Sequence, residues 1–98
     1  MPARFHRRVQ VDLDEILVKY YGISDQLGDD FFAEFQIGVG KACANPRFFH
    51  FDSSGLRRCN LERFPYHFLY DIRSDSIRVW VVRHNHRNST FGLRRFTP

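Results

Sequence analysis

The clearest alternation of hydrophobic and polar positions in the chain runs from Tyr66 to Val82. From Tyr66, apolar residues occupy every second position for eight residues, which is the period of a β-strand. The small polar residues 74–76 are typical of a turn, and the alternation resumes at Ile77. Aromatic and β-branched residues dominate both segments, as in strands that are buried on at least one face. The pattern therefore predicts a β-hairpin at the centre of a sheet, with Trp80 in the core.

The N-terminal part predicts a short strand followed by a helix. Residues 5–11 alternate between apolar and polar side chains and indicate a half-exposed or edge strand. Asp12 and Glu15 have the spacing of a capping box, so we expect the first helix to begin at Asp12. Apolar residues then recur at helical spacing, and Gly22 ends the helix.

A second helix is predicted from Ser24, a candidate N-cap, to the pair Asn45-Pro46. Gly38 and Gly40 disfavour a helix by roughly 1 kcal/mol each relative to alanine, which suggests that they permit close packing instead. The apolar stripe of this helix consists of Leu27, Phe31, Phe35, Gly38, Val39 and Ala42. Two helices with a short connection form an antiparallel hairpin.

The segment between the second helix and the β-hairpin predicts two further strands. Residues 48–52 and 56–62 alternate in polarity and are separated by the turn sequence Ser53-Ser54-Gly55, whereas residues 91–96 receive no assignment. We therefore expect one α+β domain over residues 1–98. In it, an N-terminal strand and a two-helix hairpin pack on a mostly antiparallel sheet of about four to five strands.

Charge is distributed unevenly along the chain. Through Leu56 the balance of basic and acidic residues is −2, and from Arg57 onward it is +6, which together give the net charge of +4. The basic half contains arginine but no lysine. Because the planar guanidinium suits bidentate contacts with phosphate or carboxylate, this half predicts a polyanion or an acidic protein as partner. A solvated charged face is the plainer alternative.

Other features limit the classes of function. No apolar run is long enough to span a bilayer, and the N-terminal sequence lacks the pattern of a signal peptide, so we expect a cytoplasmic protein. Cys43 and Cys59 have neither zinc-ligand nor redox-motif spacing and are expected to be small buried hydrophobes. His84 and His86 lack a third ligand nearby, so no metal site is predicted. No cofactor is expected.

The residues that follow the β-hairpin could carry out RNA cleavage. Such a reaction needs cations around the scissile phosphate and groups that exchange protons. The candidates are Arg58, Arg63, Arg83 and Arg87 for charge, and His84 and His86 for proton transfer, because imidazole titrates near neutrality. Each of them has a plainer alternative as a contact to backbone, solvent or a protein partner. Further residues expected to contribute to binding are Arg57, Arg78, Phe91, Arg94 and Arg95.

The order of motifs in the second half resembles a known family. Phe64-Pro65-Tyr66, then Tyr70, then Ile77-x-Val79-x-Val81-Val82-x-His84-x-x-Arg87, is similar to the C-terminal signature of the RelE/ParE superfamily. These proteins are the toxins of type II toxin–antitoxin systems, and the similarity is greatest to the ParE or plasmid stabilisation branch. The superfamily fold implied by this resemblance agrees with the predicted α+β arrangement.

Two functions follow from the resemblance. A ParE-like toxin inhibits bacterial growth by poisoning DNA gyrase through protein contact, without hydrolysis. A RelE-like mRNA interferase is instead a ribosome-dependent mRNA endonuclease, and such enzymes commonly carry a tyrosine near the C-terminus, where this chain has Phe91 and Phe96. Both functions imply a cognate antitoxin as partner, with no membrane and no small-molecule cofactor. A small basic binding module without toxicity is the third alternative.

Overall fold

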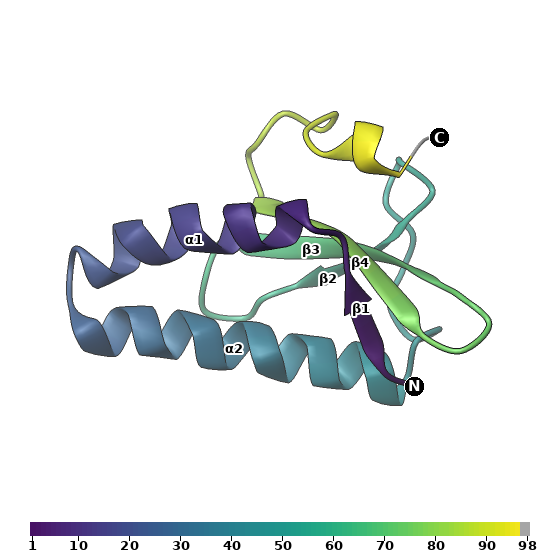
Figure 1. Ribbon diagram of the computed structural model, residues 1–98, viewed down its shortest axis with the longest axis horizontal. Helices are drawn as coiled ribbons and strands as arrows, with labels where there is room; N and C mark the ends of the chain where they lie inside the picture. Colours follow the sequence, from purple (N-terminus) through teal and green to yellow (C-terminus); the bar gives the residue numbers. More distant parts are fainter. Residues whose placement is uncertain (97–98) are drawn as a thin grey trace.

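The described part of the chain is built around a four-stranded sheet and a helical hairpin (Figure 1). The computed structural model describes residues 1–96, so the domain predicted over residues 1–98 extends beyond them. The elements, in chain order, are β1 (Ala3–Phe5), α1 (Arg8–Tyr21), α2 (Asp25–Ala44), β2 (Arg57–Asn60), β3 (Tyr66–Ile72), β4 (Ile77–His84) and the 3₁₀ helix η1 (Leu93–Arg95). The predicted α+β class is confirmed.

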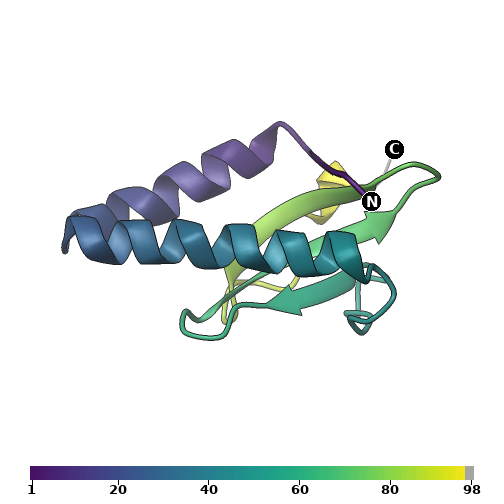
Figure 2. The ribbon, with the colours of Figure 1, turned by 90° about the horizontal axis from the view of Figure 1, so that it is seen from below.

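The sheet has the strand order β1-β4-β3-β2. β1 lies parallel to β4, whereas the β2/β3 and β3/β4 pairs are antiparallel, as the prediction of a mostly antiparallel sheet requires. Both helices cover the same face of this sheet (Figure 2). The core beneath them is rich in aromatic side chains, and Tyr20, Phe31 and Phe64 meet with ring centroids 5.0 to 5.5 Å apart. Such contacts stabilise the core beyond the burial of area alone.

The predicted boundary between the first strand and the first helix is wrong. β1 ends at Phe5 and α1 begins at Arg8, so residues 8–11 are helical. Val9 is buried together with Leu13, Ile16 and Tyr20, a spacing of three and four residues that outweighs the short alternation. Asp12 is therefore not an N-cap. It lies inside the helix, and its carboxylate points toward the sheet.

The limits of α2 are as predicted. The Ser24 hydroxyl accepts a hydrogen bond from the backbone N–H of Leu27 at 3.1 Å, and the helix ends at Ala44 before Asn45-Pro46. The two glycines differ. A Cβ atom at Gly38 would lie 3.2 Å from a ring carbon of Phe68, which confirms close packing there, but a Cβ at Gly40 would contact nothing within 4 Å.

Residues 48–52 do not form the predicted strand. They belong to a loop whose one ladder contact is an isolated bridge between Phe51 and Arg57. The Arg57 side chain donates to the carbonyls of Arg47 and Phe49, at 3.1 and 2.8 Å. Side-chain donors thus replace the strand partner that the backbone would otherwise need.

The second face of the sheet has its own smaller core. Leu56, Leu69, Trp80 and Val81 are buried there, and Phe91 and Leu93 of the C-terminal segment pack on them. Trp80 is in the core, as expected, and its indole N–H donates to Asp71 at 2.9 Å. The register of β3 against β4 shifts between Leu69 and Tyr70, which leaves Trp80 as the extra residue of a bulge.

The side chains of Asp12 and Arg95 form hydrogen bonds with the backbone edge of β4 at this bulge. β1 pairs with β4 as far as Val79, and beyond that point no strand within residues 1–96 pairs with this edge. The Asp12 carboxylate accepts from the backbone N–H of Val82 at 3.1 Å, and Arg95 donates to the Trp80 carbonyl at 3.1 Å. Asp12 and Arg95 also form a two-bonded ion pair, at 2.6 and 2.9 Å, with side chains only 4% and 10% exposed.

Candidate functional site

Arg83 is the centre of a buried polar network on the sheet face opposite the helices. Its side chain is 3% exposed. Nε donates to Nε2 of His67 at 3.0 Å, and Nη1 donates to the carbonyls of Ser89 and Phe91, both at 2.9 Å. The other terminal nitrogen lies 3.8 Å from the carboxylate of Asp52. These contacts hold the C-terminal segment and the loop after α2 against the sheet.

His67 and Asn85 extend this network towards Arg58. Because Nε2 of His67 accepts from Arg83, its Nδ1 carries the proton and donates to the Asn85 side-chain oxygen at 2.9 Å. That oxygen also accepts from Arg58 at 3.4 Å. Burial lowers the pKa of His67 to about 4, so the imidazole is neutral at physiological pH.

Asp52 balances the two arginines of the network. It lies 3.7 Å from Arg58 and 3.8 Å from Arg83. Burial by itself would raise the pKa of Asp52, but hydrogen bonds from Ser54 and the charges of the two arginines outweigh it, and the pKa is lowered. The network therefore has a fixed negative charge opposite two positive charges, and burial lowers the pKa of Arg83 as well.

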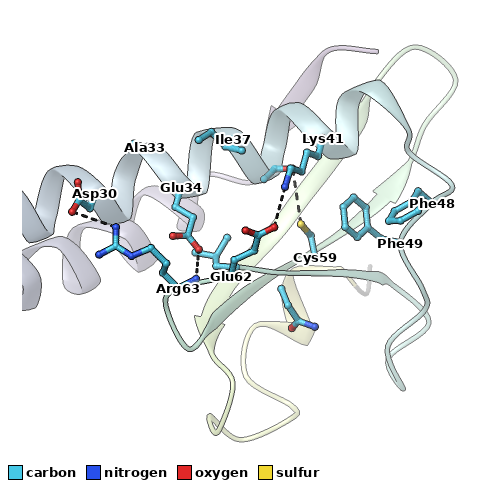
Figure 3. A pocket seen from close by; sticks show the side chains of 13 residues that line it. Asp30, Ala33, Glu34, Ile37, Lys41, Phe48, Phe49, Cys59, Glu62 and Arg63 are labelled. Carbon is cyan, nitrogen blue, oxygen red and sulfur yellow. Dashed lines mark hydrogen bonds and ion pairs between the residues drawn. The ribbon is translucent and has the colours of Figure 1, made fainter.

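The six predicted catalytic residues do not come together in one place. Arg58 and Arg83 meet in the buried network, but Arg63 lies beside α2, where it pairs with Asp30 at 3.4 Å (Figure 3). The three other residues lie beyond or at the end of β4. The His84 ring packs edge-on against Tyr66 with centroids 5.0 Å apart, and the His86 ring is in edge contact with His84 at 5.4 Å. Arg87 lies over the ring of Phe91 at 4.0 Å.

His84 and His86 interact mainly with each other and with neighbouring residues of the structure. Nδ1 of His84 accepts from the backbone N–H of His86 at 3.0 Å. Burial, together with the neighbouring charges of His86 and Lys19, lowers the pKa of His84. The neutral form that results can accept a proton, and His84 lines a hollow of about 160 Å³ together with Arg83 and Arg87, whereas Arg58 and Arg63 do not line it. Catalysis by His84 or His86 stays a prediction.

The predicted binding residues also differ in accessibility. Arg57 lies over the ring of Phe51 at 4.2 Å, and Arg78 lies over Trp80 at 5.4 Å. Arg95 is occupied by Asp12, and Phe91 is half-buried between Arg87 and Arg95. Arg94 is thus exposed on η1, whereas Arg57, Arg78 and Arg95 are half-buried.

A groove runs between α2 and the edge strand β2 (Figure 3). It has a volume of about 460 Å³. The buried side chains of Cys59 and Leu61 line it, and Ile37 on α2 is 58% exposed beside them. Burial raises the pKa of the Cys59 thiol to about 11, so this cysteine behaves as the small hydrophobe expected from the sequence, whereas Cys43 is half-buried.

Charged residues of both signs border this groove. Lys41 and Glu62 pair across it at 3.3 Å, and Glu34 accepts from the backbone N–H of Arg63 at 2.7 Å. An apolar groove with charges of both signs at its borders is suited to an amphipathic segment of another protein. None of this geometry requires a cofactor.

Sequence reasoning missed the groove beside α2 and four polar residues with buried contacts: Asp12, Asp52, Asn85, and His67 as a hydrogen-bonded member of a network. His67 was expected only to pack in the sheet. Its position opposite Arg83 in the register of β3 and β4 is the one signal that could have indicated the contact. Asp52 and Asn85 lie in loops and follow no pattern.

Within residues 1–96, no group of three or more His, Cys, Asp or Glu side chains is arranged to hold a metal ion. None of the helices in that part of the chain has the length and apolar character needed to cross a membrane.

Comparison with known proteins identifies a structural relative. No protein-family model matches the chain, and no curated protein matches it. A solved structure titled "Chromosomal ParDE TA system from P. aeruginosa" contains a chain that superposes with a TM-score of 0.73. The two sequences are 20% identical, and the match covers 86% of this chain and 95% of that chain. The chain therefore shares its fold with a chain of that ParDE structure. The architecture implied by the sequence resemblance is thereby confirmed.

Proposed function

We propose that this chain is the toxin of a type II toxin–antitoxin system, of the ParE-like kind, and that a cognate antitoxin neutralises it. The observation that carries the proposal is the shared fold with a chain of a ParDE system over 95% of that chain's length. The sequence motifs between Phe64 and Arg87 favour the same branch independently. We expect the protein to act in the cytoplasm.

We expect the toxin to act by binding a protein target, DNA gyrase, and not by cleaving RNA. The arrangement of the site residues agrees better with binding than with RNA cleavage. A nuclease needs its cations and proton-transfer groups around one phosphate. Here Arg83 is buried among carbonyls, Arg63 lies next to α2, and His84 packs on Tyr66. Codon-specific mRNA cleavage would require these groups to rearrange.

The groove between α2 and β2 is the expected binding site of the antitoxin. Its apolar floor and its charged borders match an amphipathic partner segment. Binding there would leave the face that carries η1 uncovered.

Induced expression in a bacterial host tests the proposal. We expect growth to stop on induction and to recover when a genomic library of the source organism supplies the antitoxin gene. A host that grows normally with abundant, folded protein would refute the toxin assignment.

A second pair of assays identifies the target. We expect purified protein to inhibit gyrase supercoiling or to trap the cleaved DNA complex, and to leave mRNA intact in a cell-free translation reaction analysed by primer extension. Codon-registered cuts that disappear in a His84→Ala, Arg87→Ala variant would instead identify a ribosome-dependent nuclease. The matched control is Arg4→Ala, which removes an exposed arginine of β1 that lies beside the opposite end of β4.

A further inference from the structure

The loop Arg47–Arg58, here called the aromatic–arginine loop, exposes two large aromatic side chains. Phe48 is 72% and Phe51 is 65% exposed. Between them, Phe49 turns inward and packs on the core. Phenylalanine at such exposure is unfavourable in water, and neighbouring exposed aromatic residues commonly mark a surface that another molecule covers.

The backbone of this loop is held in place by hydrogen bonds from Tyr70 and from the end of the loop itself. The Tyr70 hydroxyl donates to the Pro46 carbonyl at 2.6 Å just before the loop, and Arg57 donates to the carbonyls of Arg47 and Phe49. The backbone N–H of Arg58 donates to the carbonyl of His50 at 2.9 Å. The two phenylalanines are therefore presented on a preorganised backbone, which reduces the entropic cost of binding.

The surface of the loop is basic. Asp52 is its one acidic residue, and that side chain is 9% exposed because it turns inward to Arg58 and Arg83. Arg47 and His50 are exposed, and the guanidinium of Arg57 lies 4.2 Å from the centre of the Phe51 ring. The buried network thus removes the only carboxylate that could neutralise this surface from within the loop.

We infer that the aromatic–arginine loop docks an acidic, extended segment of a partner protein. A hollow of about 410 Å³, lined by Phe48, Phe51 and Arg58 among others, would receive an apolar side chain of that segment. Carboxylates on either side of the apolar residue would pair with Arg57 and Arg47. Asn60 at the edge of β2 also lines the hollow, so the backbone of an extended segment would find hydrogen-bond partners there.

A protein segment fits this surface better than single-stranded nucleic acid. Base stacking needs open aromatic faces. One face of Phe51 is covered by Arg57, and the Phe48 ring is in edge contact with Phe49, with centroids 5.2 Å apart. Arginine and aromatic residues held in fixed positions are the residues that dominate protein–protein binding energy. The inference does not depend on the proposed toxin function, because it concerns binding alone.

Selection from a phage-displayed library of random dodecapeptides on the full-length protein tests the inference. We expect the recovered peptides to be acidic and to contain an apolar or aromatic residue. Fluorescence anisotropy with the labelled peptides should show binding weakened about tenfold or more by Phe51→Ala or by Arg47→Glu. The matched control is Val18→Ala, which truncates a side chain that is 75% exposed on α1.

Both loop variants change exposed side chains, and thermal unfolding should confirm that they keep the stability of the wild type. Peptides without an acidic bias, peptides that bind the variants and the wild type equally, or a library with no loop-dependent binder would each overturn the inference. So would a uridine oligoribonucleotide whose binding is lost in Phe51→Ala while the peptides bind unchanged, or a dimer of this chain that Phe51→Ala dissociates.

Discussion

Acidification should weaken the fold chiefly through one buried side chain, that of His67. The residue is 1% exposed, and burial lowers its pKa from 6.5 to about 4. The unfolded chain therefore binds the proton at a higher pH than the folded chain does. The contribution of neutral His67 is complete above pH 6.5 and is lost as the pH falls towards 4. At 1.36 kcal/mol per pKa unit, the expected loss is roughly 3 kcal/mol.

Urea unfolding between pH 7.5 and 4 measures this loss, with the fluorescence of the one tryptophan, buried Trp80, as the signal. His67→Gln keeps an acceptor for Arg83 and a donor for Asn85 but does not titrate, so its stability should vary much less over the same range. His86→Gln, which changes an exposed histidine, should follow the wild type. If wild type and His67→Gln lose equal stability between pH 6.5 and 4, the assignment of the effect to His67 is refuted.

Two further predictions concern stability. Asp12→Asn should lower the free energy of unfolding by about 3 kcal/mol, because it leaves the charge of Arg95 buried without its partner, whereas Asp14→Asn on the exposed side of α1 should have little effect. Urea midpoints of the two variants provide the comparison, and equal midpoints would contradict it. Gly40→Ala should stabilise the protein by up to about 1 kcal/mol, because an alanine there meets nothing, and Gly38→Ala should gain less or destabilise it, because its Cβ would press on Phe68. Thermal unfolding that ranks the two alanine variants in the opposite order would show that α2 packs differently.

Elements with local signals were predictable from the sequence. The hairpin of β3 and β4 follows from its alternation, and the limits of α2 follow from Ser24 and Pro46, because a cap or a proline acts on the backbone within a few residues. The pattern order from Phe64 to Arg87 also indicated the fold class.

Features that depend on distant residues were not predictable. Asp12 has the spacing of a capping residue, but its partners Val82 and Arg95 lie 70 and 83 positions away. Residues 48–52 alternate like a strand, yet side-chain donors from Arg57 and Tyr70 hold the backbone in a loop. The candidate site was the least predictable part of the structure, because burial of Arg83 and separation of Arg63 from the other arginines arise only from the tertiary arrangement.

The ion pair between Asp12 and Arg95 also has a kinetic consequence. It joins positions 83 residues apart, so we expect it to form late in folding, after a large loop has closed. An interaction absent from the folding transition state acts almost wholly on the rate of unfolding. The pair therefore governs how long a folded molecule resists spontaneous opening and attack by proteases, and it has little influence on how fast a new molecule folds.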